Sequence, residues 1–244
     1  MGSGRFHEQN QIFQAKSGIK KILALLPNLT KIKTVLDLGC GRGAVSAALV
    51  KKGLRVFGVD VNHKALKEAR KRGLKVKKAD LETGLPFKKF KFDLILANDI
   101  IEHIYDWQGL AQELNRVLRP AGKIIIVTPN HFDIRSRLAI LGGRGIVHWS
   151  SRQWTTAAQY GHIRFLKLQE LEAFWQAQGF YPHKRRFNYM AGGLLPQKLT
   201  PKWLRKRLLK AFPELLSGKY GLLLGKYPTQ RVETVYLPET VQGM

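Results

Sequence analysis

Short apolar runs alternate with helix-like segments through the first half of the chain. Strands are expected at residues 33–39, 54–60, 74–80, 91–99 and 123–130, and helices at 44–53, 62–72 and 107–122. The strand runs are apolar throughout rather than at every second position, so both faces of each strand should be buried. Strands and helices in alternation are typical of an α/β fold. The sequence therefore predicts a doubly wound, mostly parallel sheet with helices on both faces.

The alternation stops over residues 131–167 and then resumes. The elements expected after this interruption are one helix and two strands, at 168–180, 180–190 and 219–227. A helical period also covers residues 8–27, and residues 228–244 have the composition of a loose tail. The sequence has no internal repeat and no low-complexity linker. We therefore expect a single domain over residues 1–227, with residues 131–167 as an insertion that covers the substrate.

Composition excludes several classes of protein. With 44% hydrophobic and 10% aromatic residues in 244, the chain is not intrinsically disordered. No apolar run approaches the roughly 18 residues of a membrane span, and the first residues lack the apolar core of a secretion signal. The single cysteine, Cys40, excludes an internal disulfide and suits a reducing compartment. A cytoplasmic protein is expected.

The stretch TVLDLGCGRG, at residues 34–43, is the expected ligand-binding turn. In open α/β sheets, ligands bind beyond the carboxyl ends of the strands. Gly39 and Gly41 follow the first strand and allow the backbone to turn sharply and approach a ligand. Asp60 ends the second strand, at the spacing where a carboxylate binds the hydroxyls of a ribose. The glycines alone also suit a dinucleotide, whereas the lysine of a P-loop is missing.

Asp37 distinguishes between these ligands. A carboxylate just before the turn would repel a pyrophosphate but suits a cation. S-adenosylmethionine carries a sulfonium and an ammonium group and no phosphate. Asp80 closes the third strand and offers an acceptor for an adenine amino group. Three carboxylates at three successive strand ends therefore favour S-adenosylmethionine over NAD or a nucleoside triphosphate.

Several segments resemble the successive motifs of class I S-adenosylmethionine-dependent methyltransferases. These segments are VLDLGCGRG, VFGVD, KAD, FDLILANDIIEHI, LNRVLRPAGKIIIVTPN and HIRFLKLQELEAFWQAQGF, between about residues 33 and 180. The most similar group contains quinone-biosynthesis, methionine-biosynthesis-associated and glycan O-methyltransferases. The resemblance implies a Rossmann-like methyltransferase fold, with a seven-stranded sheet whose last strand is antiparallel. Here YGLLLGKY is the candidate for that strand.

The resemblance also implies which residues bind S-adenosylmethionine. The implied residues are Asp37, Gly39 and Gly41 at the methionine moiety, Asp60 at the ribose, Asp80 and Leu81 at adenine, and Asn98 at the amino-acid end.

Transfer of a methyl group to a hydroxyl also needs a base for the hydroxyl proton. The histidines nearest the expected cleft are His162 and His103, and these are the catalytic candidates. His131, His148 and Tyr160 are weaker candidates. No convincing carboxylate set for a metal is found, so no metal site is expected. Glu102 is interpreted as a charge that favours the start of a helix.

The insertion at residues 131–167 is expected to choose the acceptor, since it follows the fifth strand and can close over the methyl group. It carries Trp149, Trp154 and Tyr160 among arginines, namely Arg135, Arg137, Arg144 and Arg152. Aromatic rings with guanidinium groups suit an amphipathic or anionic acceptor. An insertion that merely packs on itself is the alternative.

The net charge of +25 needs an explanation. Residues 64–91 carry eleven basic and three acidic side chains, and residues 197–212 carry six basic and none acidic. Within 198–212, Leu204, Leu208, Ala211 and Phe212 form an apolar line, with Arg205, Lys206 and Lys210 off it. This pattern is typical of a helix on an anionic membrane surface, and a helix packed on its own sheet is the alternative.

The favoured function is therefore methylation of a small-molecule, lipid-linked or glycan acceptor, at oxygen. An RNA methyltransferase is the alternative, because a strongly basic chain also suits phosphate backbones. Enzymes that methylate exocyclic amines of bases carry a proline-rich turn after the fourth strand, where this chain has NDII. Enzymes that methylate carbon 5 of pyrimidines use a cysteine nucleophile, but Cys40 lies in the glycine turn. Ribose or ring-nitrogen methylation stays open. A non-catalytic module that binds S-adenosylmethionine is disfavoured, because the cofactor residues are intact.

Overall fold

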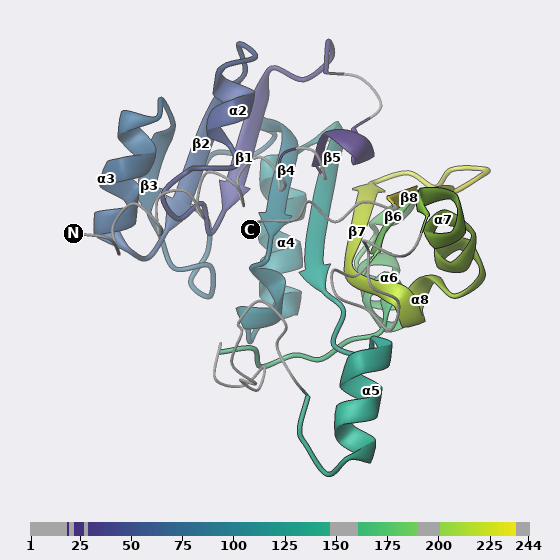
Figure 1. Cartoon of the computed structure of the whole chain (residues 1–244). Helices are drawn as coiled ribbons and strands as arrows, with labels where there is room; N and C mark the ends of the chain where they lie inside the picture. The colour runs from purple at the N-terminus through teal and green to yellow at the C-terminus, as the bar shows by residue number, and fades with distance from the viewer. Residues whose placement is uncertain (1–18, 20–21, 27–28, 147–160, 190–200, 238–244) are drawn as a thin grey trace.

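The structure is a computed structural model that describes residues 19, 22–26, 29–146, 161–189 and 201–237. Its centre is an eight-stranded sheet in the order β3-β2-β1-β4-β5-β7-β6-β8 (Figure 1). The strands are β1 (Thr34–Leu38), β2 (Arg55–Asp60), β3 (Lys75–Lys78), β4 (Phe92–Asn98), β5 (Leu118–Pro129), β6 (Tyr181–Tyr189), β7 (Ser217–Gly225) and β8 (Glu233–Leu237). The strands β1 to β5 run parallel, and β7 is antiparallel to both of its neighbours. The predicted α/β sheet is confirmed.

The helices lie on both faces of this sheet (Figure 1). They are α2 (Ala47–Val50), α3 (His63–Lys71), the 3-10 turn η1 (Ile101–His103), α4 (Trp107–Val117), α5 (Ile134–Leu141), α6 (Leu168–Ala177), α7 (Lys202–Ala211) and α8 (Pro213–Leu216). The Asn62 side chain caps α3 by accepting hydrogen bonds from the backbone N–H groups of Lys64 and Ala65. Gly73 follows the helix with φ of 90°, which a glycine adopts without strain.

Two apolar layers bury the sheet. One layer joins α4 and α6 to the sheet through residues such as Leu114 and Trp175. The other covers the opposite face, where Leu49 of α2 and Ala69 of α3 pack with Ile22. Ile22 and Leu25 are the buried part of the helix expected at residues 8–27, most of which lies outside the described residues.

The sheet has eight strands rather than the seven expected, because the segment interpreted as a tail contains β8. This strand pairs in parallel with β6 along the edge of the sheet. Tyr236 stacks on Phe187 at 5.7 Å between ring centroids, and Glu233 forms an ion pair with Lys184. The tail interpretation is therefore wrong for Glu233–Leu237, since cross-strand pairs hold these residues in the sheet.

The basic helix α7 packs on its own sheet. Arg205 and Leu209 are buried, and the helix contacts β6 and β8. Leu204 and Leu208 are half-buried, while Phe212 is exposed. The apolar line predicted for residues 198–212 is thus wrong by about one position, and Arg205 lies on the buried side. None of the described helices is long and apolar enough to span a bilayer.

Candidate functional site

The turn after β1 combines a buried carboxylate with two glycines of positive φ. Gly39 has φ of 59° and Gly41 has φ of 51°. A Cβ on Gly39 would lie 2.5 Å from Cδ1 of Ile100, so that position requires glycine. A Cβ on Gly41 would meet no atom within 4 Å, which shows open space beside the turn. The Asp37 side chain is buried directly before these glycines.

Burial raises the pKa of Asp37 to about 7, and the negative charge of Asp60 raises it further, while a hydrogen bond with Ser46 opposes the shift. A cation placed beside Asp37 would favour the ionised carboxylate and reverse this shift. The site therefore has a deficit of positive charge that a sulfonium or ammonium group can fill.

Asp60 ties the ends of β1 and β2 together. Its two carboxylate oxygens accept hydrogen bonds from the backbone N–H groups of Gly41 and Asn62, both at 2.8 Å. Asp80 is exposed and accepts from the backbone N–H of Glu82, and Leu81 beside it is buried. The carboxylates of Asp60 and Asp80 and the side chain of Leu81 thus follow the ends of β2 and β3. These are the positions predicted from the sequence for the ribose and the adenine ring.

Asn98 ends β4, and its side-chain amide donates to Asp99. Asp99 has φ of 53°, an uncommon conformation for a residue other than glycine, and forms an ion pair with Lys219 of β7. The buried carboxylate, the open glycine turn and the acceptors at successive strand ends together fit S-adenosylmethionine. The residues that could hold it are the seven predicted from the sequence, namely Asp37, Gly39, Gly41, Asp60, Asp80, Leu81 and Asn98.

A second group of polar side chains lies beyond the ends of β4 and β5. His162 and His131 share a hydrogen bond of 2.8 Å between Nδ1 and Nε2, and both side chains are buried. Glu102 is also buried, and its Oε2 accepts from the Thr128 hydroxyl at 3.2 Å. The Oε1 atom of Glu102 has no hydrogen-bond partner among the described residues. A buried oxygen of this kind can accept a hydrogen bond from a bound ligand.

Backbone contacts bring His162 to this place. The N–H groups of Ile163 and Arg164 both reach the carbonyl oxygen of Glu102, at 3.0 and 3.3 Å. Nδ1 of His103 lies 3.0 Å from the carbonyl oxygen of Gly161, and the rings of His103 and His162 are 4.8 Å apart. These hydrogen bonds therefore attach residues 161–164, near the end of the insertion, to η1.

Burial raises the pKa of Glu102 to about 8, and the charge of Asp99 adds to the rise. At neutral pH the Glu102 carboxyl is therefore largely protonated. Glu102 does stand in the first turn of the short helix η1, as interpreted from the sequence, and its side chain is buried beside His162 and Thr128.

Glu102, His103 and His162 could also hold a metal ion, since each offers one ligand atom and these atoms lie within 4.8 Å of one another. Carboxylate and imidazole ligands suit a transition metal such as zinc or manganese. The sequence analysis predicted no metal site because it found no convincing carboxylate set for a cation and interpreted Glu102 as a charge at a helix start.

The structure thus brings together both predicted catalytic histidines, His162 and His103, with His131. Glu102 and Thr128 are the residues that sequence reasoning did not select. Glu102 directly precedes His103, and that pair at a strand end was the available signal. The remaining candidates of the insertion lie outside the described residues, namely His148, Trp149, Arg152, Trp154 and Tyr160.

A methyltransferase domain model matches residues 7–184 of the chain. The chain belongs to the class I S-adenosylmethionine-dependent methyltransferases. Among the solved structures, this methyltransferase is similar to an S-adenosylmethionine-dependent methyltransferase of Thermotoga maritima, described as a possible histamine N-methyltransferase. The two share 18% identity over 93% of this chain and 96% of the other, with a TM-score of 0.63. A methyltransferase of Archaeoglobus fulgidus has 17% identity over 92% and 99% and a TM-score of 0.62. At such identities these structures support the fold alone.

Curated relatives of the methyltransferase include proteins named ubiquinone biosynthesis O-methyltransferase. The relative from Idiomarina loihiensis is 30% identical over 57% of this chain and 58% of its own length. The relative from a Chelativorans species is 27% identical over 71% of this chain and 66% of its own length. The chain therefore spans less than two thirds of the length of these two relatives.

Proposed function

We propose that this methyltransferase transfers a methyl group from S-adenosylmethionine to a hydroxyl of a small-molecule acceptor. The observation that carries the proposal is the buried pair of Glu102 and His162 beyond the end of β4, which supports a role for His162 as proton acceptor. The names of the curated relatives, which are O-methyltransferases, support oxygen as the atom that receives the methyl group. A lipid-linked or glycan acceptor carries the same hydroxyl chemistry.

The cofactor supplies the activated methyl group, and the chain supplies alignment and a proton acceptor. Asp37 balances the positive charge of the bound cofactor, and Asp60 keeps the glycine turn attached to β2. A His162 that donates from Nδ1 to Nε2 of His131 keeps its own Nε2 able to accept the acceptor's proton. A protonated His162 would favour ionisation of Glu102, whose Oε1 lies 4.0 Å away, so that the carboxylate and the imidazolium stabilise each other.

Burial of this group strengthens each of these interactions. Glu102, His131 and His162 are all less than 7% exposed, so water does not compete for their polar atoms. Thr128 holds the Glu102 carboxyl from the side of β5. The arrangement supports deprotonation of a bound hydroxyl, which an amine acceptor would need less.

The test is incubation with methyl-labelled S-adenosylmethionine and separate small-molecule, lipid and RNA extracts. Label in a small hydroxylated compound is the expected result, and Glu102→Gln should lower its formation. Label in RNA alone would instead establish the alternative function, which the net charge of +25 favours. Binding of S-adenosylmethionine without transfer to any fraction would contradict the enzymatic proposal.

Contact with an anionic membrane surface is a separate proposal about location. It rests on the exposed side of α7, where Trp203, Lys206, Arg207 and Lys210 face outward while Leu209 is buried. Such a contact would bring the enzyme to a lipid-linked acceptor.

A further inference from the structure

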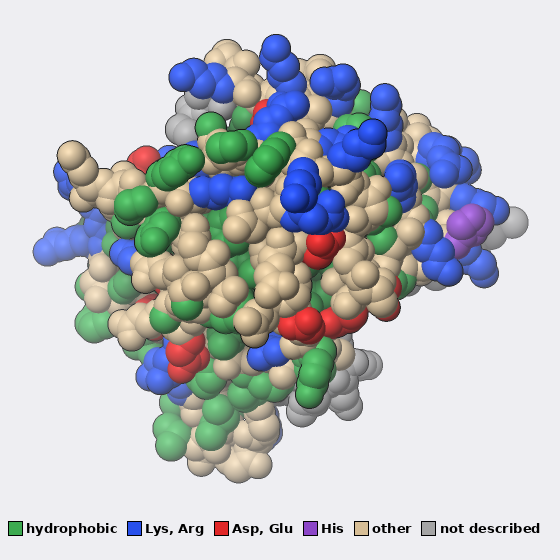
Figure 2. Space-filling view, turned by 180° about the vertical axis from the view of Figure 1, so that it is seen from behind, with side chains coloured by type: hydrophobic (Ala, Val, Ile, Leu, Met, Phe, Trp, Pro, Cys, Tyr) green, Lys and Arg blue, Asp and Glu red, His purple; other side chains and the backbone are tan. Residues whose placement is uncertain are grey.

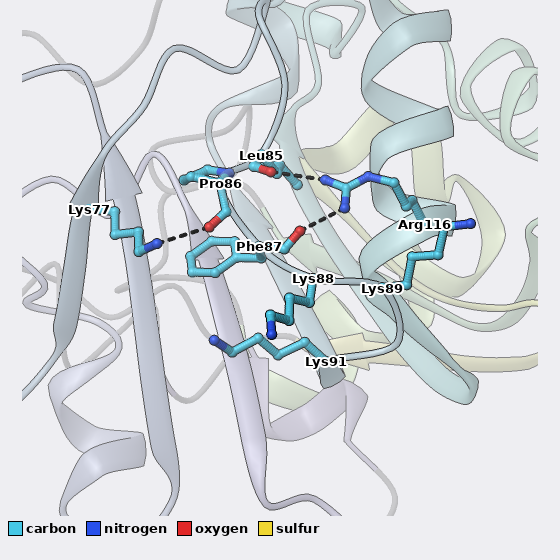
Figure 3. A pocket seen from close by; sticks show the side chains of 8 residues that line it. All are labelled: Lys77, Leu85, Pro86, Phe87, Lys88, Lys89, Lys91 and Arg116. Carbon is cyan, nitrogen blue, oxygen red and sulfur yellow. Dashed lines mark hydrogen bonds between the residues drawn. The ribbon is translucent and has the colours of Figure 1, made fainter.

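A hollow lies on the face of the sheet that carries α4, away from the glycine turn. Figure 3 shows Phe87 at its centre, with Lys77 on one side and Arg116 of α4 on the other. The hollow has a volume of about 730 Å³, and four of the residues around it are lysines, Lys77, Lys88, Lys89 and Lys91. The proposed methyl transfer does not use any of them.

The positive charge of this hollow is not balanced by carboxylates. Arg116 is paired with Glu113 and donates to the carbonyl oxygens of Leu85 and Phe87, so its charge is already used. Among the described residues, none of the four lysines forms an ion pair with an acidic side chain. Figure 2, which shows the molecule from behind, has Lys and Arg side chains gathered over its upper half and most acidic ones below.

Three aromatic rings hold the ammonium groups in place. Phe57, Phe87 and Phe92 pack edge to face with ring centroids 5.0 to 5.9 Å apart. Nζ of Lys91 lies 4.3 Å from the centroid of Phe57 and 5.0 Å from that of Phe87. Nζ of Lys77 lies 5.4 Å from the Phe87 centroid. These cation–π contacts restrict where the charges can move.

The cluster is unfavourable without a counter-ion. Burial lowers the pKa of Lys91, and the charges of Lys77, Lys75 and Lys88 lower it further. Lys77 uses one donor on the carbonyl oxygen of Pro86, at 3.0 Å, which keeps its ammonium group at the rim. Like charges held together at a concave surface focus a positive potential there.

We propose that this hollow binds a small ligand that carries two or more adjacent phosphate groups. Lysine ammonium groups bind phosphate as point charges, and several of them match several charges. The volume lies within the range of small-molecule pockets, roughly 300–1,000 Å³. A small phosphorylated ligand is favoured over a nucleic acid because the lysines surround a hollow rather than line a long strip. The inference does not depend on the acceptor of the methyl group.

The full chain should be titrated with tripolyphosphate by isothermal calorimetry, with orthophosphate as the singly phosphorylated comparison. The test variant is Lys77→Gln with Lys91→Gln. The matched control is Lys51→Gln with Lys52→Gln, which removes the same charge from exposed positions after α2. We expect tripolyphosphate to bind at least tenfold more weakly to the test variant and within twofold of the wild type to the control.

Titration with S-adenosylmethionine shows whether the test variant is still folded. Both variants should bind S-adenosylmethionine with the affinity of the wild type. If the test variant fails to fold, Lys88→Gln replaces it, since that side chain is exposed. Equal weakening in test and control variants, or equal affinity for orthophosphate and tripolyphosphate, would overturn the proposal and leave the lysine stems as a cover for the aromatic rings. Tighter binding of single-stranded RNA, with the same dependence on Lys77 and Lys91, would also overturn it.

Discussion

Oε1 of Glu102 lies 4.0 Å from Nε2 of His162, and both side chains are buried. This separation is too long for a direct hydrogen bond, so the two polar atoms face each other across a gap. A hydroxyl oxygen could not lie between them, but one placed beside the pair could be within hydrogen-bond distance of both atoms. Glu102 belongs to η1, whereas His162 lies near the end of the insertion at residues 131–167, so residues far apart along the chain complete the site.

Replacing Glu102 by Gln should lower kcat and leave the affinity for S-adenosylmethionine nearly unchanged. The amide keeps the shape of the side chain but cannot ionise, whereas Glu102 can lose its proton and stabilise a protonated His162. A proton-transfer partner contributes roughly 10²-fold or more to the rate. Steady-state kinetics with the acceptor and calorimetry with the cofactor would measure the two effects. Glu68→Gln, on the exposed side of α3, is the matched control, and an unchanged kcat in Glu102→Gln would refute the role.

The free energy of unfolding should fall as the pH rises from about 5 to 8. The pKa of Glu102 is raised to about 8 in the folded protein, from 4.5 in the unfolded chain. Over this range the folded state keeps a proton that the unfolded state has released, so rising pH favours unfolding. The expected slope approaches about 1.4 kcal/mol per pH unit, the value for a difference of one bound proton between the two states. Urea unfolding at several pH values should show a flatter profile for Glu102→Gln, and an equally steep profile in that variant would show that Glu102 is not responsible.

Affinity for S-adenosylmethionine should rise with pH around neutrality. The pKa of Asp37 is about 7 in the absence of the cofactor, and a bound cation requires the ionised carboxylate. At pH 6 the Asp37 carboxyl has to release a proton when the cofactor binds, whereas at pH 8 it is already ionised. The dissociation constant should therefore be roughly tenfold higher at pH 6 than at pH 8. Asp37→Asn should bind more weakly and with no such dependence. Calorimetry at the two pH values measures both, and a pH-independent wild type would contradict the assignment.

The exposed side of α7 should bind vesicles that contain anionic lipid and not neutral vesicles. Each basic side chain near such a surface contributes about 1 kcal/mol. Trp203→Ala with Lys206→Gln should reduce cosedimentation without changing stability, because both side chains are exposed. Leu209→Ala should instead destabilise the protein by about 2–5 kcal/mol, since that side chain is fully buried. Undiminished vesicle binding by the exposed-face variant would exclude α7 as the contact.

The sequence by itself determined the α/β sheet and the cofactor turn, because both depend on neighbours along the chain. Apolar runs bounded by glycine define the buried strands, and Asp37, Gly39 and Asp60 stand at strand ends whatever the packing. The Asn62 side chain likewise caps α3 through two hydrogen bonds to backbone N–H groups two and three residues along the chain. Such features are local, so a pattern is enough to find them.

Only the tertiary structure decided which distant residues meet. Glu102, Thr128 and His162 lie on three separate segments, and backbone hydrogen bonds between residues 102 and 163 bring them together. The buried side of α7 depends on where β6 and β8 lie, so an apolar line in the sequence misplaced Arg205. Cross-strand pairing likewise ordered Glu233–Leu237, where Thr, Val and Tyr favour a strand but only the edge of β6 supplies a partner. These contacts depend on packing between segments that are far apart along the chain, so local sequence patterns do not predict them.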